Sequence, residues 1–210
     1  LEFEGIRFGG EFYLNGKSIG MSENGVMAFG FDISDKVNYS GENILGARID
    51  NSWRYKEKSS GSGYQWNDRN FYANFGGIPK NVYLHVTPRI YQTLPLYSNL
   101  LTTGTYIYAR EIDITNRSAM IYAESQVRNE FPVEKTVTME VRVEDMDGKT
   151  IKVYNSKAEK IGAGETKTLK AADKITGLHF WSWGYGYLYK VYTTLNVDNK
   201  PIDVVCTRTG

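Results

Sequence analysis

Residues 136–143 read TVTMEVRV, and apolar side chains alternate with polar ones through the whole stretch. A period of two is the pattern of a β-strand with one buried face. Asp147-Gly148 follows, a dipeptide typical of tight hairpin turns, and residues 150–154 (TIKVY) then continue as a second strand. The stretch therefore predicts an antiparallel hairpin.

Further strands are predicted on both sides of this hairpin. They are expected at residues 106–114, 119–127, 187–197 and 202–207, with two short strands within 157–169. Seven or so strands spaced about 8–12 residues apart indicate an immunoglobulin-like β-sandwich. We expect this domain to span residues 89–210, with residues 89–104 as the connector that leads into it.

The first 88 residues predict a separate all-β domain. Asn15-Gly16 lies between the short stretches FYL (12–14) and KSIG (17–20), which is a strong hairpin signal. Other strands are expected within residues 1–6, 26–33, 44–50 and 82–86. Thr87-Pro88 breaks the pattern and marks the boundary of this domain.

Composition excludes several classes of protein. The 25 Lys and Arg residues nearly balance the 24 Asp and Glu residues, so the concentrated positive charge that nucleic acids or anionic membranes attract is missing. No run of about 18 apolar residues is present, so no membrane-spanning helix is expected. A single cysteine and two histidines argue against an internal disulfide, a metal site and a Ser-His-Asp triad. We expect no metal and no cofactor.

Four stretches, taken in order, resemble the non-catalytic domains of glycoside hydrolase family 2, the β-galactosidase and β-glucuronidase group. They are LEFEGI with FYLNGK (1–6 and 12–17), FDIS with GENIL (31–34 and 41–45), GIPKNVYL (77–84) and LHFWSWGYGYLY (178–189). Ser182 and Gly186 depart from the family pattern, which has prolines near these positions. The resemblance implies a partial sugar-binding jelly roll at 1–88, followed by the immunoglobulin-like domain at 89–210.

The resemblance also implies a function for the parent protein. That protein would be a retaining exo-β-glycosidase, most similar to β-galactosidases, acting in the breakdown of oligo- or polysaccharides. Two glutamates on a TIM barrel, expected to follow this chain, would perform the chemistry, so the chain alone is not expected to catalyse. Its partners would be the carbohydrate, bound through the parent enzyme, and the barrel. A periplasmic or secreted location is favoured over a cytoplasmic one.

The segment between residues 51 and 78 contains the candidate site. Sugars are bound by aromatic faces and by planar amide or carboxylate side chains, and the segment supplies both kinds. The candidate substrate-binding residues are Trp66, Asn67, Asp68, Arg69, Asn70, Tyr72 and Asn74. In the family, the corresponding loop reaches toward the barrel. A second interpretation stays open, in which the aromatic residues only cover the end of the sandwich.

Other residues are expected to be structural. Glu130 follows Asn129 as a catalytic acid/base would, but Pro132 marks a turn there and a solvated acid is favoured. His85 and His179 are expected to be packed or hydrogen-bonded, and Cys206 to be buried. The aromatic residues of the 181–189 stretch are expected to fill the sandwich core; they are Trp181, Trp183, Tyr185, Tyr187 and Tyr189.

Two alternatives to the glycosidase hypothesis remain. The chain would then be a stand-alone carbohydrate-binding module or adhesin, or a structural spacer. A jelly roll without its early strands also exposes a sheet edge, so we expect pairing with a second copy through that edge.

Overall fold

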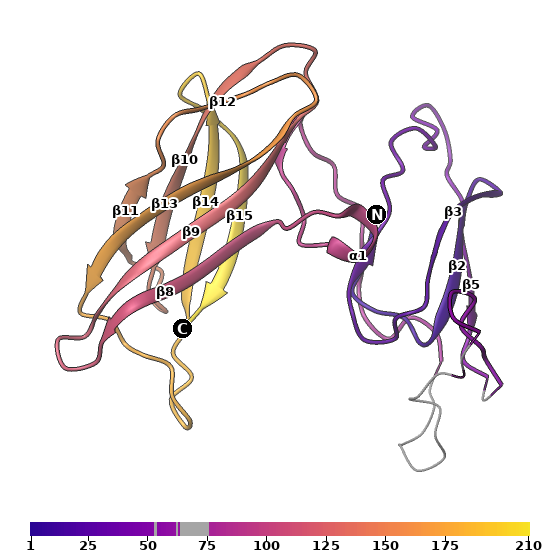
Figure 1. Cartoon of the computed structure of the whole chain (residues 1–210), viewed down its shortest axis with the longest axis horizontal. Helices are drawn as coiled ribbons and strands as arrows, with labels where there is room; N and C mark the ends of the chain where they lie inside the picture. Colours follow the sequence, from indigo (N-terminus) through magenta and orange to yellow (C-terminus); the bar gives the residue numbers. More distant parts are fainter. Residues whose placement is uncertain (53, 62, 64–75) are drawn as a thin grey trace. The chain divides into compact units, whose positions relative to one another are not determined.

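The computed structural model describes residues 1–52, 54–61, 63 and 76–210, which form two compact units (Figure 1). The first unit contains residues 1–85 together with residues 96–101. The second contains residues 86–95 and 102–210. Strands dominate both units, and the described residues contain one short helix, α1 (Tyr97–Leu100), which contacts strand β4 of the first unit.

Two antiparallel sheets of three strands make up the first unit. In one sheet, β1 (Glu2–Phe3) lies between β4 (Phe29–Gly30) and β6 (Val82–Tyr83). In the other, β2 (Gly9–Leu14) lies between β3 (Lys17–Ser22) and β5 (Leu45–Asp50). Asn15 and Gly16 close the β2–β3 hairpin with φ values of 51° and 75°, which confirms the turn predicted from their sequence.

Four phenylalanine rings form the centre of the first core. Phe3, Phe12, Phe29 and Phe31 are buried, and their ring centroids lie between 4.5 and 6.4 Å apart. Burying a phenylalanine side chain contributes about 1.5–3 kcal/mol. These rings therefore hold β1 and β4 in place although each strand has only two residues.

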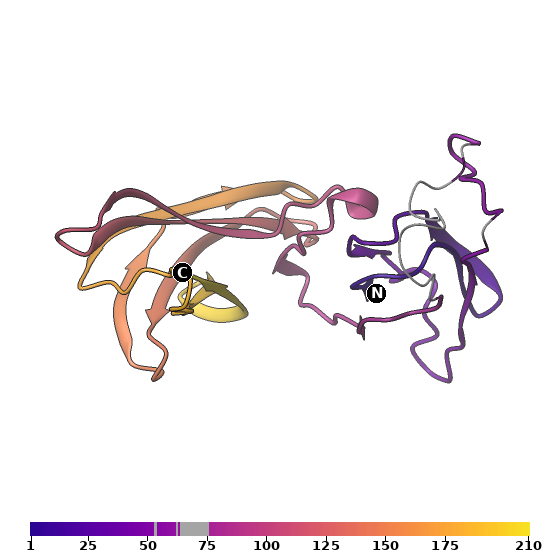
Figure 2. The ribbon, with the colours of Figure 1, turned by 90° about the horizontal axis from the view of Figure 1, so that it is seen from below.

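The second unit is a sandwich of two antiparallel sheets, and Figure 2 shows them one above the other. One sheet has the order β11-β10-β14-β15, with β12 also paired to β10; the other has the order β13-β9-β7, with β8 also paired to β9. The strands are β7 (Ile90–Gln92), β8 (Thr105–Asp113), β9 (Ser118–Asn129), β10 (Lys135–Glu144), β11 (Thr150–Asn155), β12 (Glu159–Ile161), β13 (Thr166–Thr176), β14 (Tyr189–Val197) and β15 (Lys200–Thr209).

Strict alternation in the sequence corresponds to strict alternation in burial. Val137, Met139, Val141 and Val143 of β10 are all buried, and the residues between them face outward. The all-β fold class predicted from the sequence is confirmed, and the sheet arrangement is that expected for a jelly-roll sandwich and an immunoglobulin-like sandwich.

The predicted connector at 89–104 contains ordered elements. Ile90–Gln92 forms β7, which pairs with β9, whereas residues 96–101 belong to the first unit. The sequence lacks a signal for β7, because three residues are too few to display a period. The domain limits 1–88 and 89–210 stay a prediction.

Candidate functional site

All seven residues predicted to contact sugar lie outside the described residues. They are Trp66, Asn67, Asp68, Arg69, Asn70, Tyr72 and Asn74. Their role therefore stays a prediction. The structure describes the chain on both sides of them, from Asp50 to Gly61 with the exception of Trp53, and again from Gly76 onward.

The backbone of Arg7 and Phe8 joins the two sides of this segment. The Phe8 amide donates a hydrogen bond of 3.3 Å to the Asp50 carbonyl. The Arg7 amide donates to the Gly77 carbonyl at 2.9 Å, and the Gly77 amide donates back to the Arg7 carbonyl at 3.2 Å. The two ends of the segment, at Asp50 and Gly77, are therefore held next to each other by Arg7 and Phe8. We call these four residues the neck.

Glycine is required where the segment rejoins the unit. A Cβ atom on Gly76 would lie 2.5 to 2.8 Å from the side-chain atoms of Asn51, on the other side of the neck. Gly77 has a φ of 98°, which residues with a Cβ rarely adopt. The Gly76-Gly77 pair thus lets the two ends of the segment approach closely.

One carboxylate, that of Glu23, holds the first part of the segment. It follows directly on β3 and accepts the Tyr55 hydroxyl at 2.7 Å and the Lys58 amide at 2.6 Å, both on Oε1. Its Oε2 accepts the Ser59 amide at 3.3 Å. Hydrogen bonds to an ionised acceptor are stronger than neutral ones. We call Glu23, Tyr55, Lys58 and Ser59 the Glu23 clamp.

The clamp fixes the protonation states of its members. Burial acts to raise the pKa of Glu23, but the hydrogen bonds from Tyr55, Lys58 and Ser59 outweigh it and hold that pKa below its ordinary value of 4.5. Burial, and then the nearby Glu23 carboxylate, raise the pKa of Tyr55 well above its ordinary 10.0. At neutral pH the charge therefore stays on Glu23 and the proton on Tyr55.

A small hollow lies beside the clamp. Its volume is about 80 Å³, and it is lined by Gly9, Gly10, Glu11, Met21, Arg48, Asp50, Tyr55 and Lys58. Glu11 forms ion pairs with Lys58 and, at 3.6 Å, with Arg48. Ligand pockets usually have volumes of about 300–1,000 Å³, so this hollow is too small for a sugar ring.

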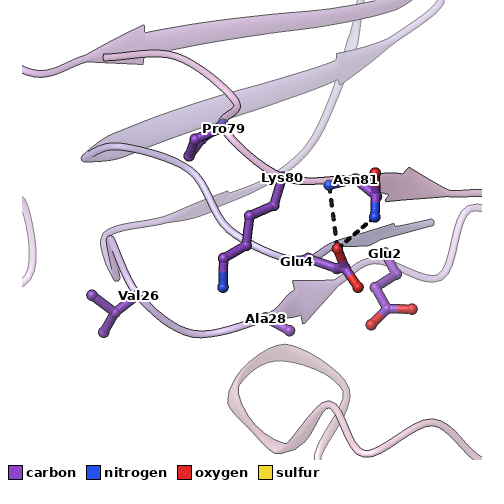
Figure 3. A pocket seen from close by; sticks show the side chains of 7 residues that line it. All are labelled: Glu2, Glu4, Val26, Ala28, Pro79, Lys80 and Asn81. Atoms are coloured by element: carbon purple, nitrogen blue, oxygen red, sulfur yellow. Dashed lines mark hydrogen bonds between the residues drawn. The ribbon is translucent and has the colours of Figure 1, made fainter. Parts of the chain in front are cut away.

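A wider, open hollow of about 610 Å³ lies next to the residues that follow the neck (Figure 3). It is lined by Glu2, Glu4, Val26, Ala28, Pro79, Lys80 and Asn81. The Glu4 carboxylate accepts the Asn81 side-chain amide at 2.9 Å and its backbone amide at 3.3 Å, as Figure 3 shows. Glu2 bonds His85 Nε2 at 2.7 Å, which confirms His85 as a hydrogen-bonded residue. Both carboxylates thus tie β1 to the chain that leaves the neck.

Asn129 and Glu130 build a turn. The buried Asn129 side chain donates to the carbonyls of Val133, Ile161 and Gly162 at 2.9–3.0 Å. Glu130 is exposed and accepts the Tyr91 hydroxyl at 3.1 Å. The structure therefore gives this pair a role in packing.

The aromatic stretch at 181–189 contradicts the expectation that it fills the core. Tyr189 is buried and Tyr187 partly so, but Trp181 and Tyr185 are exposed, and Trp183 is 96% exposed. The reason is a turn in which Ser182 and Tyr185 exchange backbone hydrogen bonds of 2.9 and 3.0 Å. Strand β14 begins only at Tyr189, so strand alternation does not apply before it. The turn also brings the Tyr185 hydroxyl to 3.0 Å from His179 Nδ1.

The expectation that Cys206 is buried is also wrong. It lies on β15, the edge strand of its sheet, and is exposed. Among the described residues there is no cluster of three or more His, Cys, Asp or Glu side chains that could hold a metal ion. Within the same part of the chain, no helix has the length and apolar character needed to cross a membrane.

Residues 105–210, about half of the chain, match the family Glycosyl hydrolases family 2. The chain belongs to this family. A β-glucuronidase of Formosa agariphila is 32% identical over 203 residues, which is 97% of this chain and 20% of that protein. The β-galactosidase BoGH2A of Bacteroides ovatus is 24% identical over 210 residues, the whole of this chain and 22% of that protein.

Solved structures of glycosidases agree with this assignment. A β-glucuronidase of the family has a TM-score of 0.90 and 32% identity; the match covers all of this chain and 22% of that protein. A putative β-galactosidase from Bacteroides fragilis has a TM-score of 0.81 and 27% identity; the match covers all of this chain and 29% of that protein. This family 2 chain thus spans about a fifth of the length of the curated relatives named above.

The sequence did not point to the Glu23 clamp. Glu23 lies 32 residues before Tyr55 and 35 before Lys58, and no local pattern connects them. The available signal was indirect, because the hairpin turn at Asn15-Gly16 fixes where β3 begins and its register with β2, and Glu23 follows that strand.

Proposed function

We propose that this family 2 chain is a non-catalytic part of a retaining exo-β-glycosidase, in which it presents residues 64–75 to the sugar. The Glu23 clamp carries this proposal, because one carboxylate organises residues 55–59 through three hydrogen bonds. Fixing residues 55–59 before the sugar binds reduces the entropy that binding would otherwise cost.

The composition of the segment supports sugar as its ligand. Tryptophan and tyrosine rings stack on the C–H faces of sugars, and Asn, Asp and Arg side chains bond hydroxyl or carboxylate groups. The segment holds the rings of Trp66 and Tyr72 and five such polar side chains, which are Asn67, Asp68, Arg69, Asn70 and Asn74. Carbohydrate is also the substrate class that the names of the relatives imply.

The chemistry is proposed to lie elsewhere in the parent protein. Retaining glycosidases need two carboxyl groups about 5–5.5 Å apart. Glu130, the acid that the sequence singled out, is bound to Tyr91 at a turn. The barrel that the family resemblance implies would supply both catalytic glutamates.

For the substrate we propose a β-glucuronide. The relatives that share 32% identity with this chain are named β-glucuronidases. A β-galactoside is the second candidate, favoured by the β-galactosidase names of relatives at 24% and 26% identity. Arg69 is the residue of the segment suited to pair with a uronate carboxylate.

Exposed apolar side chains support docking against other parts of a parent protein. Trp183 is 96% exposed at the tip of its turn, and Trp181 and Tyr185 on either side of it are exposed by 56% and 46%. Soluble monomers rarely expose large contiguous apolar patches. We propose that the turn at 182–185 buttresses the catalytic barrel.

Activity assays test this proposal. The 210-residue chain and the full-length parent are each incubated with an aryl β-glucuronide and an aryl β-galactoside. We expect the parent to hydrolyse the glucuronide faster and the chain alone to hydrolyse neither. Hydrolysis by the purified chain would refute the non-catalytic role, and faster hydrolysis of the galactoside would replace the proposed substrate by the second candidate.

The alternative of a stand-alone binding module has its own test. Calorimetric titration of the 210-residue chain with glucuronate oligosaccharides would give millimolar or tighter binding that a Trp66→Ala and Tyr72→Ala double variant loses. The glycosidase proposal expects the chain alone to bind weakly through this segment, because the barrel supplies most contacts in the parent.

A further inference from the structure

The second unit contains a hollow of about 440 Å³ on the outer face of its sheet of strands β8, β9 and β13. It is lined by Pro95, Thr103, Gly104, Thr105, Tyr106, Glu124 and Thr168. Its volume falls within the range of about 300–1,000 Å³ typical of ligand pockets. None of its residues belongs to the segment at 64–75.

Tyr106 forms the aromatic wall of this hollow. Its ring stacks on Tyr108 with centroids 5.1 Å apart, and Tyr108 stacks on Tyr122 at the same distance, with planes only 5° apart. The Arg110 guanidinium lies 5.3 Å from the Tyr108 centroid and 5.7 Å from that of Tyr122. Tyr106 is thus the outermost ring of a supported column, and it remains 63% exposed.

Sheet stability accounts for only part of this column. Tyr108 and Tyr122 lie directly opposite each other on β8 and β9, and cross-strand aromatic pairs stabilise sheets. Tyr106 has Glu124 opposite it, and its ring exposes a large apolar surface to water. The ring face is therefore free to contact a ligand.

Glu124 places a carboxylate oxygen at the same hollow. Its Oε1 accepts the Tyr108 hydroxyl at 3.0 Å and the Lys170 ammonium at 3.1 Å. Its Oε2 has no hydrogen-bond partner among the residues that the structure describes. Because a carboxylate oxygen can accept two hydrogen bonds, Oε2 is available to hydroxyl groups of a ligand.

The rim of the hollow is held rigidly. The Gln126 side-chain oxygen accepts the Thr93 hydroxyl at 2.7 Å and the Thr103 amide at 3.0 Å, and the Gly104 amide donates to the Thr93 hydroxyl at 3.2 Å. Gly104 has a φ of 65°, and a Cβ there would lie 2.6 Å from the Pro95 nitrogen. A rim fixed in this way loses little freedom when a ligand binds.

We infer that this hollow binds one neutral pyranose ring of a glycan. The ring would stack its C–H face on Tyr106 and donate its hydroxyls to Glu124 Oε2 and to Thr168. A neutral sugar is favoured over a uronate, because the lining residues include one carboxylate and Lys170 already pairs with it. We call this hollow the Tyr106 site.

The test is a titration of the ¹⁵N-labelled 210-residue chain, followed by NMR. The probe is methyl β-galactopyranoside, and methyl β-glucuronide is the anionic control. We expect shifts of the Thr103, Gly104, Tyr106 and Thr168 amides, with a dissociation constant on the order of 1 mM for the galactoside and at least tenfold weaker binding of the glucuronide. No shifts at these amides, or equal binding of the glucuronide, would overturn the inference.

Matched variants identify the stacking ring. Tyr106→Ala should weaken galactoside binding at least tenfold, whereas Tyr106→Phe should retain it because the ring face is kept. Tyr97→Ala is the control, since Tyr97 is 68% exposed and lies outside the hollow. Retained binding in Tyr106→Ala would refute the site.

The outcome is separable from that of the proposed function. Shifts confined to residues 64–75 would support the loop and refute the Tyr106 site. Shifts confined to the Tyr106 site would support that site and leave the proposed function to the activity assays of the full-length parent, because the chain alone is expected to bind only weakly through residues 64–75. The wild-type titration decides between them without any variant, so an unfolded Tyr106→Ala protein would not prevent a decision.

Discussion

The Tyr55 hydroxyl donates a 2.7 Å hydrogen bond to Oε1 of Glu23, which stands 32 residues earlier in the chain. This bond joins the start of the candidate sugar-binding segment to the end of β3. Since β3 is paired with β2, and β2 carries Phe12 and Leu14 of the core, the segment is connected directly to the packed interior of the first unit.

Tyr55→Phe should loosen the segment without removing the ring. The substitution deletes one hydrogen bond to a charged acceptor, which is worth about 1.5 kcal/mol. We expect faster hydrogen exchange at the Lys58 and Ser59 amides. Tyr39→Phe is the control, because Tyr39 is 80% exposed and its hydroxyl bonds a nearby backbone carbonyl. Equal exchange in both variants would show that Glu23 does not organise the segment.

The clamp should also open in acid. The pKa of Glu23 is lower in the folded chain than its ordinary 4.5, so its contribution is complete above about pH 4.5 and is lost as the pH falls through the folded value. We expect the Tyr55 ring and Lys58 amide signals to titrate together in that range by NMR. In Glu23→Gln these signals should not titrate, and they should already resemble the acid form at neutral pH.

How far the sequence predicts this structure depends on the range of the interactions. Alternation identifies β10 at Lys135–Glu144, and Asn15-Gly16 identifies the first hairpin, because both signals are local. Burial of Trp183 was predicted wrongly, because the turn at Ser182–Tyr185 is set by pairing that a strand period does not encode. The sequence does not reveal Glu23 or the pairing of Tyr106 with Glu124 for the same reason, since these partners lie on another strand or in a distant segment.

Gln92→Leu should destabilise the second unit. Gln92 is buried, and its side chain donates to the Thr193 carbonyl at 2.9 Å and accepts the Ser125 hydroxyl at 2.9 Å, joining β7 and β9 of one sheet to β14 of the other. Leucine would leave these buried groups without their partner, at a cost of about 1–3 kcal/mol. Urea unfolding followed by a β-sheet signal measures the loss. An unchanged midpoint would mean that neighbouring groups replace the amide.

Trp183→Ser should distinguish a role of Trp183 in docking against the parent protein from a role in the folding of the 210-residue chain. Because Trp183 is 96% exposed, its loss should change the stability of the 210-residue chain by less than about 0.5 kcal/mol. In the full-length parent we expect a lower melting temperature, since the buttress contact is lost. Phe180→Ala is the comparison, because Phe180 is partly buried and packs against the core of the second unit, so its loss should destabilise the short chain as well. An unaffected parent would argue against docking through this turn.

Gly9→Ala should disrupt the Glu23 clamp by displacing the Tyr55 ring. A Cβ on Gly9 would overlap the ring of Tyr55, so the ring must move away from Glu23. Overpacking of this kind costs about 1–3 kcal/mol. Gly46→Ala is the matched control in the neighbouring strand, because a Cβ there meets its nearest atom, Tyr13 Cβ, at an ordinary 3.8 Å. Alanine at Gly46 should be neutral or slightly stabilising, since it reduces the freedom of the unfolded chain. If Gly9→Ala were as stable as Gly46→Ala and kept protected Lys58 and Ser59 amides, the Tyr55 ring would not be what fixes the segment.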